Sequence, residues 1–245
     1  MADLVVRVGS RSAQGVRPNN EDAYVITPDS RLFLVADGMG GQDRGEVASH
    51  MAIDIIPRVI GDRLAANEPA DYAVDKALHE ANTAICEAGK EQPEGRRMGT
   101  TAVMALHING TVYVANFGDS RAYLIRGDDV QQLTIDHSVA QALVHCGALT
   151  PEEARYSPYQ HVLHKFLGCM TLSDKAEIRP FTPMPGDRLV LASDGLTNHV
   201  EDEDLRQGAR GYPDPNAWAY HLVELALARG SRDNVTCVVV AFEAA

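Results

Sequence analysis

The chain is poor in cysteine and in basic residues, and each of these two shortages argues against a class of protein. Its four cysteines, at positions 86, 146, 169 and 237, have no C-x-x-C spacing, which argues against a zinc site and a disulfide framework. We expect free thiols in a reducing compartment. Aromatic residues make up only 6% of the 245 residues, and 22 basic residues face 34 acidic ones. The net charge of −12 argues against nucleic acid or an anionic membrane as the main partner.

Long hydrophobic runs and linker-like tracts are also missing. No apolar run approaches the roughly 20 residues that span a bilayer. The first ten residues, MADLVVRVGS, do not have the pattern of a signal peptide. No Ser/Gly tract or proline-rich spacer divides the chain. We therefore expect a single cytoplasmic domain over residues 1–245, whose hydrophobic content of 45% is ordinary for a protein with a sizeable core.

Short apolar stretches bounded by Gly, Asn, Asp or Pro predict β-strands. They lie at about residues 4–8, 23–26, 31–36, 101–108, 111–117, 121–126, 188–192 and 235–242. The dipeptide Asn109-Gly110 is the strongest hairpin signal, and Gly127-Asp128 predicts a second hairpin. Because such short turns join antiparallel neighbours, we expect antiparallel sheets.

Three longer segments have helical periodicity, at about residues 44–60, 70–89 and 215–229. In the first, Pro57 predicts a kink or a break. The buried face of that helix is expected to consist of Val47, Met51, Ile55 and Val59. Antiparallel strands with grouped helices indicate a layered α+β fold rather than a doubly wound parallel sheet.

The segment at about residues 138–180 has little strand pattern. It contains a capping box from Thr150 to Glu153, with Pro151 at the first helical position. We expect a small helical excursion from the sheets, and such excursions are often positioned over a functional site.

Acidic residues recur where the predicted strands begin or end. The segments RLFLVADGMGG (31–41) and RLVLASDGLTN (188–198) both place an aspartate, Asp37 or Asp194, at a strand tip before a glycine that allows a sharp turn. Further acids at strand ends or starts are Asp119, Asp233, Glu21 and Asp22. Asp-Gly is a common turn dipeptide, so any one of these acids has an ordinary explanation. Together they predict a site for an oxygen-preferring cation such as Mg²⁺ or Mn²⁺.

The glycines after Asp37 do not match a phosphate-binding loop. A G-x-G-x-x-G pattern would need glycine at position 43, which is aspartate, and there is no G-K-[ST] sequence. We therefore expect the glycines to free a backbone carbonyl that can turn toward a cation bound by Asp37.

Seven motifs in order carry a resemblance to a known family. They are RPNNEDA (17–23), VADGMGG (35–41), GTTAV (99–103), NFGDSRAYL (116–124), LTIDHS (133–138), LASDGLTN (191–198) and SRDNVT (231–236). This set resembles the metal-dependent protein phosphatases of the PP2C, or PPM, family, and especially its bacterial serine/threonine phosphatases. The resemblance runs from about residue 5 to 242. It implies a four-layer α-β-β-α sandwich, with the excursion at about 138–180 as the family's flap.

The resemblance also implies a site for two Mn²⁺ or Mg²⁺ ions. Asp37 would bridge both ions, and the Gly38 carbonyl would bind the first. Asp194 and Asp233 would bind the second.

Further site residues follow from the resemblance. A third, weaker ion would use Asp119 together with the Asp194 carboxylate. Glu21 and Asp22 would contact the ions mainly through waters. Arg17, at the arginine of the R-x-x-N-E-D motif, would clamp two phosphate oxygens with its planar guanidinium.

No general acid is assigned by the motifs. Animal members carry a histidine directly after the first Asp-Gly, whereas this chain has Met39. His137, His161 and His164 are alternative proton donors or structural groups, and we place His161 at the substrate. The substrates would be phosphoproteins made by a serine/threonine kinase. A catalytically weak binding protein with the same fold, and a metal-dependent nuclease or phosphodiesterase, remain as alternative functions.

Overall fold

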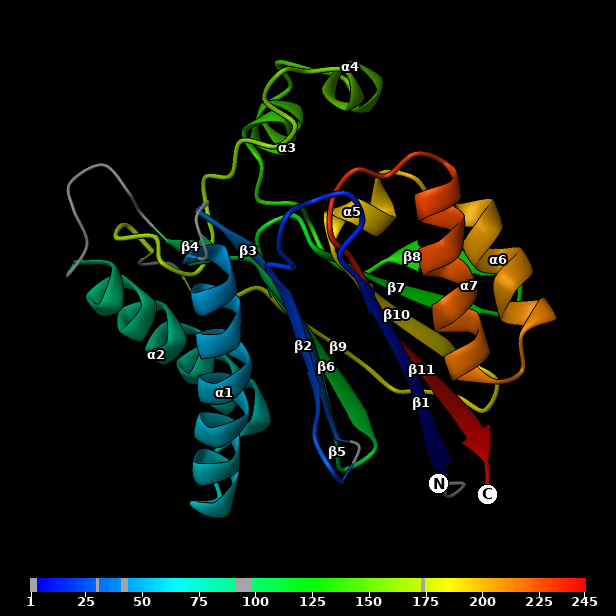
Figure 1. The fold of residues 1–245 in the computed structure, drawn as a ribbon. Coiled ribbons are helices and arrows are strands. Elements are labelled where there is room, and N and C mark those ends of the chain that lie inside the picture. The colour runs from blue at the N-terminus through cyan, green and yellow to red at the C-terminus, as the bar shows by residue number, and fades with distance from the viewer. Residues whose placement is uncertain (1–3, 30, 41–43, 91–97, 173–174) are drawn as a thin grey trace.

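The computed structural model describes residues 4–29, 31–40, 44–90, 98–172 and 175–245, in which two antiparallel sheets lie between helices (Figure 1). The first sheet has the strand order β1 (Leu4–Ala13), β11 (Val235–Ala244), β10 (Arg188–Ala192), β7 (Arg121–Arg126) and β8 (Asp129–Gln132). The second has the order β2 (Asp22–Ile26), β3 (Leu32–Met39), β5 (Ala102–Ile108), β6 (Thr111–Phe117) and β9 (Ile178–Phe181), with the short β4 (Gly99–Thr100) paired to β3.

Both predicted hairpins are confirmed. Asn109 and Gly110 have φ values of 50° and 75°, and they join β5 to β6 so that Ile108 pairs with Thr111. Positive φ at both central residues is the geometry of a type I′ turn, which matches the twist of the strands it joins. Gly127, with φ 59°, lies in the turn between β7 and β8.

Strands β3, β5, β10 and β11 are buried on both faces over most of their length, and successive residues enter different layers of the core. In β5, Val103 and Ala105 pack between the two sheets, whereas Met104 and Leu106 pack against helices. This alternation is the period of two that a β-strand imposes on its side chains. Burial on both faces explains why the strand reads as a continuous apolar run.

Helices cover the outer face of each sheet (Figure 1). The second sheet is covered by α1 (Arg44–Ala65) and α2 (Ala70–Lys90). The first sheet is covered by α5 (Asp194–Thr197), α6 (Asp202–Gly211) and α7 (Pro215–Ala228). The predicted four-layer α-β-β-α sandwich is therefore confirmed.

The details of α1 differ from the prediction. The helix continues through Pro57 to Ala65, so of the two predicted alternatives, a kink or a break, the break is wrong. Of the predicted buried face, Val59 is buried and Met51 and Ile55 are partly buried against the core, but Val47 is 49% exposed. The fully buried residues of the helix are Gly45, Ala48, Ser49, Ala52, Ile56, Val59 and Ile60. Small residues in the first half of this face let the start of α1 approach β3, and that approach shifts the buried stripe away from the bulkier Val47.

The predicted excursion contains α3 (Val139–His145) and α4 (Pro151–Arg155), which stand above one end of the sandwich in Figure 1. The capping box between Thr150 and Glu153 is confirmed. Residues 178–180 belong to β9, which pairs with β6, so the last three residues of the predicted excursion are part of the second sheet. Among the described residues, no helix combines the length and the apolar character needed to cross a membrane.

Candidate metal centre

Both sheets contribute acids to one centre. Asp37 lies opposite Asp22 in the register of β2 and β3. Asp194 opens α5 directly after β10, and Asp119 and Asp233 lie in the loops before β7 and β11. The charges that act on Asp37 are those of Asp22, Asp194, Asp119 and Asp233. The structure therefore brings together five of the acids that the sequence singled out.

The backbone of Asp37 is held by two threonines of the GTTAV motif. Its N–H donates to Thr101 Oγ1 at 3.0 Å, and its carbonyl accepts from the Thr101 N–H at 2.8 Å and from Thr100 Oγ1 at 3.0 Å. The Thr101 hydroxyl also lies 2.6 Å from the hydroxyl of Ser120, next to Asp119. The motif thus fixes Asp37 and links it to the Asp119 loop.

Gly38 does not form the sharp turn that we expected. It lies within β3, and the positive φ of 145° occurs two residues later, at Gly40. A Cβ atom on Gly38 would lie much closer to the backbone of Gly45 than the 3.0 Å limit of real contacts, and a Cβ on Gly45 would meet the Gly38 backbone. The two glycines therefore serve the close approach of α1 to β3. The Gly38 N–H donates to the carbonyl of Glu21 at 3.1 Å.

A single asparagine, which sequence reasoning missed, ties the first motif to the last. The Asn234 side chain accepts the Glu21 N–H at 2.8 Å and donates to the carbonyls of Gln14 and Asn19. Arg17 forms an ion pair with Asp233, with Nη2 and Oδ2 2.6 Å apart. The only sequence signal for Asn234 was its place in the SRDNVT motif.

Burial makes several of these acids reluctant to ionise. It raises the pKa of Asp22 to about 7, although hydrogen bonds from Thr236 and Ser193 act in the opposite direction. It raises the pKa of Asp119 to about 7 as well, together with the charge of Asp194. The pKa of Asp37 lies well above its usual value, first because of burial and then because of the neighbouring acids.

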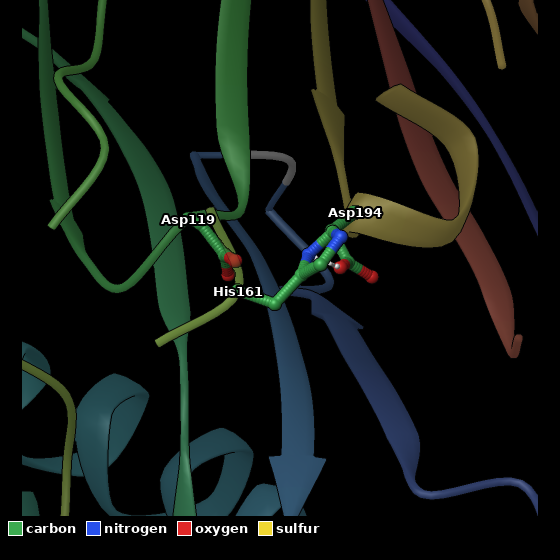
Figure 2. A group of neighbouring side chains, drawn as sticks. All are labelled: Asp119, His161 and Asp194. Atoms are coloured by element: carbon green, nitrogen blue, oxygen red, sulfur yellow. Dashed lines mark ion pairs between the residues drawn. The ribbon is translucent and has the colours of Figure 1, made fainter. Parts of the chain in front are cut away.

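Asp194 behaves differently because a histidine reaches it from the excursion (Figure 2). His161 Nδ1 lies 3.5 Å from Asp194 Oδ2, and this partner raises the pKa of His161. Burial, the largest single effect on Asp194, favours its neutral form, but the hydrogen bond and charge of His161, with hydrogen bonds to Asp37 and Asn198, together lower the pKa. Donor atoms of Asp119, His161 and Asp194 all lie within 4.8 Å of one another. We call these three residues the Asp119–His161–Asp194 cluster.

The other two histidines considered as proton donors occupy different surroundings. His137 is 5% exposed, and burial, with the charges of Lys165 and His164, lowers its pKa to about 4. A ring that is neutral at pH 7 does not carry the extra proton of a general acid of imidazolium type. Burial also lowers the pKa of His164.

The residues of this centre fit a hard divalent cation. The acids offer oxygen donors, which Mg²⁺ and Mn²⁺ prefer. Asp22 Oδ1 is buried without a hydrogen-bond partner among the described residues, and such an orphaned oxygen needs a cation or a water. A divalent cation would also stabilise the negative charges of Asp22, Asp37 and Asp119, which burial and, after it, the neighbouring acids disfavour.

Comparison with known proteins decides the family. The sequence profile described as protein phosphatase 2C matches residues 10–224. The chain belongs to this family. This match confirms the resemblance to the PP2C family, and the relatives described next confirm its resemblance to bacterial serine/threonine phosphatases.

The relatives of this PP2C-family chain include one bacterial phosphatase that is longer than the chain and one of similar length. Serine/threonine protein phosphatase PstP of Mycobacterium tuberculosis is 36% identical over 241 residues, which cover 96% of this chain but 45% of PstP. The chain thus spans less than half the length of that relative. Serine/threonine phosphatase stp of Listeria innocua is 32% identical over 232 residues, which cover 92% of this chain and 91% of stp.

Solved structures of this family share the fold. The crystal structure of PstP has a TM-score of 0.85 and 36% sequence identity, covering 98% of this chain and 100% of the PstP chain. A second structure, the catalytic domain of PstP in complex with two manganese ions, has a TM-score of 0.83 and 35% identity with the same coverage.

Proposed function

We propose that the chain is a metal-dependent phosphatase that hydrolyses phosphoserine and phosphothreonine in proteins. The observation that carries the proposal is the convergence of Asp37 with four other acids from both sheets, where burial raises the pKa values of Asp22, Asp37 and Asp119. Buried carboxylates gathered in one place destabilise the folded protein unless cations bind them. Membership in the PP2C family supports the same activity.

The acids would hold two Mn²⁺ or Mg²⁺ ions, as the manganese complex of PstP supports. Asp37 would bridge them, and the Gly38 carbonyl would complete the first site. Asp194 and Asp233 would bind the second ion. When bound, the cations supply a water of lowered pKa and offset negative charge on the phosphoryl group.

Other residues would complete the centre and position the substrate. Asp22 and Glu21 would act through waters. Arg17 would clamp two phosphate oxygens, and to do so it would release Asp233, its present partner at 2.6 Å. A third, weaker ion would lie between Asp119 and Asp194, with His161 beside it on the substrate side.

The charge of the chain, its retained acids and its cysteines favour a protein substrate over the alternative functions. The net charge of −12 disfavours a nucleic-acid substrate, and with it the nuclease alternative. Retention of all the acids disfavours a binding protein without catalysis. All four cysteines are free in the structure, which supports a reducing, cytoplasmic location and substrates made there by a serine/threonine kinase.

The test is hydrolysis of a phosphopeptide panel with saturating Mn²⁺. We expect phosphate release from phosphoserine and phosphothreonine peptides, and little from phosphotyrosine peptides. Asp37→Asn should reduce the rate at least about a hundredfold, because even outer-shell partners of a metal cost about 10–100-fold. A protein with full Mn²⁺ occupancy that releases phosphate from none of the peptides would refute the proposal.

A further inference from the structure

The segment Asp136–Ala140, which includes the end of the LTIDHS motif, contacts both the Asp119 loop and the part of the flap that carries His161. We propose that His137 is a positioning residue that sets the separation of Asp119 and His161, and thereby the affinity of the third cation. This inference rests on the proposed function, because it concerns the third cation of the same centre. It assigns a role to a motif that the two main cations leave unexplained.

On one side, the segment grips the Asp119 loop. The Gly118 N–H donates to His137 Nδ1 at 3.2 Å, and the His137 N–H donates to the Gly118 carbonyl at 2.9 Å. The neighbouring Asp136 accepts from Arg121 Nε at 2.9 Å and from Arg121 Nη2 at 2.6 Å. Both residues that flank Asp119 and Ser120 in the GDSR sequence are therefore held by Asp136 and His137.

On the other side, the same segment pairs with the flap. The His164 N–H donates to the His137 carbonyl at 3.0 Å, and the Val139 N–H donates to the Val162 carbonyl at 2.7 Å. Ser138 and Leu163 form an antiparallel bridge between these bonds. The pairing begins one residue after His161. The segment Asp136–Ala140 therefore contacts both the loop that carries Asp119 and the part of the flap that follows His161.

The His137 ring is suited to a fixed structural role. It is buried and packs against Phe117 and His164, with ring centroids 5.9 and 6.0 Å apart. Because Nδ1 accepts the Gly118 N–H, the proton of the neutral ring lies on Nε2. Burial also lowers the pKa of the ring to about 4, so the acceptor is kept at neutral pH. Loss of this acceptor would leave a buried N–H without a partner and loosen the loop.

Two substitutions separate the acceptor from the bulk of the ring. His137→Leu fills similar space without an acceptor, whereas His137→Asn offers a side-chain oxygen near the place of Nδ1. The Mn²⁺ dissociation constants can be measured by calorimetry or by EPR of free Mn²⁺. We expect the constant of the weakest-binding site to rise at least about tenfold in His137→Leu. It should return to within about threefold of the wild-type value in His137→Asn, and the tighter ions should be unaffected in both.

A matched control is His107→Leu. His107 is a partly buried histidine of β5 whose ring packs edge-on against Phe242, at a centroid distance of 5.6 Å. The His137 ring also contacts a phenylalanine, Phe117, in a tilted arrangement at 5.9 Å. This substitution should leave every Mn²⁺ dissociation constant unchanged. An equal rise in His107→Leu would show a general loss of order and would overturn the positioning role.

Val139→Pro provides a second test should His137→Leu not fold. It removes the N–H that bonds Val162, yet position 139 is the first residue of α3, where proline is well accepted. Ser138, with φ −89° and ψ 156°, already has the extended backbone that a following proline requires. We expect the same selective rise in the weakest dissociation constant, with α3 intact by circular dichroism.

The outcomes distinguish this inference from the proposed function. A wild-type third-ion affinity in folded His137→Leu or Val139→Pro, or a wild-type protein that binds only two ions, overturns the positioning role even when phosphopeptides are hydrolysed. If the wild-type protein hydrolyses none of the peptides but His137→Leu still loses the weakest ion and His137→Asn regains it, the proposed function fails and the positioning role stands.

Discussion

Asp37 and Asp194 have nearly the same local sequence, VADG and ASDG, yet the two halves of the sandwich treat their charges in opposite ways. Asp37 lies inside β3 of the second sheet, and burial with the charge of Asp22 raises its pKa. Asp194 starts α5 after a strand of the first sheet, and His161 lowers its pKa in spite of burial. The local motif determines the position of each aspartate in the fold, whereas residues distant in the sequence determine its pKa.

The glycines that follow these two aspartates, Gly38 and Gly195, have the same structural role in both halves of the sandwich. A Cβ on Gly38 would meet the Gly45 backbone, and a Cβ on Gly195 would meet the Asn234 carbonyl. Neither glycine has a positive φ. Both are therefore needed for the close approach of another segment of the centre, rather than for a turn.

The largest expected effect comes from exchanging each acid for its amide. Asp37→Asn and Asp194→Asn should each reduce Mn²⁺-dependent hydrolysis at least about a hundredfold. Only Asp37→Asn should raise the melting temperature of the metal-free protein at pH 7, because it removes a carboxylate that burial and Asp22 destabilise, whereas Asp194→Asn removes the partner of His161. Equal melting temperatures for the two variants would show that the two halves do not differ in this way.

An intermediate effect, on the stability of the fold, is expected when the glycine after either aspartate is replaced by alanine. Gly38→Ala and Gly195→Ala should each lower the free energy of unfolding by about 1–3 kcal/mol, because the added methyl groups overpack the contacts with Gly45 and Asn234. Chemical denaturation measures this loss. Gly61→Ala in α1 is the control, since a Cβ there meets nothing within 4 Å. It should be neutral or stabilise the helix by up to about 1 kcal/mol. Loss of stability in Gly61→Ala alone would contradict the close-approach explanation.

A further prediction concerns how the stability of the metal-free protein depends on pH. The pKa values of Asp22 and Asp119 rise from 3.8 to about 7 in the folded state. Between these values the folded protein binds more protons than the unfolded one, so stability is lost as pH rises from about 4 to 7. We expect the melting temperature to fall over this interval by at least about 2–4 °C, the shift that 1 kcal/mol produces in a chain of this size.

Two further measurements sharpen the pH prediction. Asp22→Asn should flatten the fall in melting temperature, because the amide cannot ionise. Saturating Mn²⁺ should reverse it, because cation binding favours the ionised acids of the folded state. A metal-free melting temperature that rises steadily from pH 4 to 7 would show that these acids ionise freely in the folded protein.

Prediction from the sequence succeeded where short-range rules decide the structure. The Asn109-Gly110 hairpin follows from the backbone freedom of two residues, and the capping box of α4 from side chains three positions apart. It failed at β9 and α5, where the pattern was too short to show a period. Strand β9 has four residues, one of them Pro180, and is held in place by pairing with β6. Helix α5 is also only four residues long, so its sequence shows no period that could have predicted it.

The sequence by itself determined the layered fold, the family and the set of acids, because alternation, turn dipeptides and ordered motifs are properties of neighbouring residues. Only the tertiary structure decided how those acids are charged and held. The contacts of Asp22 with Asp37, of His161 with Asp194 and of His137 with Gly118 join residues far apart in the chain. Burial and Coulomb interaction depend on distance in space, so no local pattern could have revealed that one Asp-Gly aspartate resists ionisation while the other favours it.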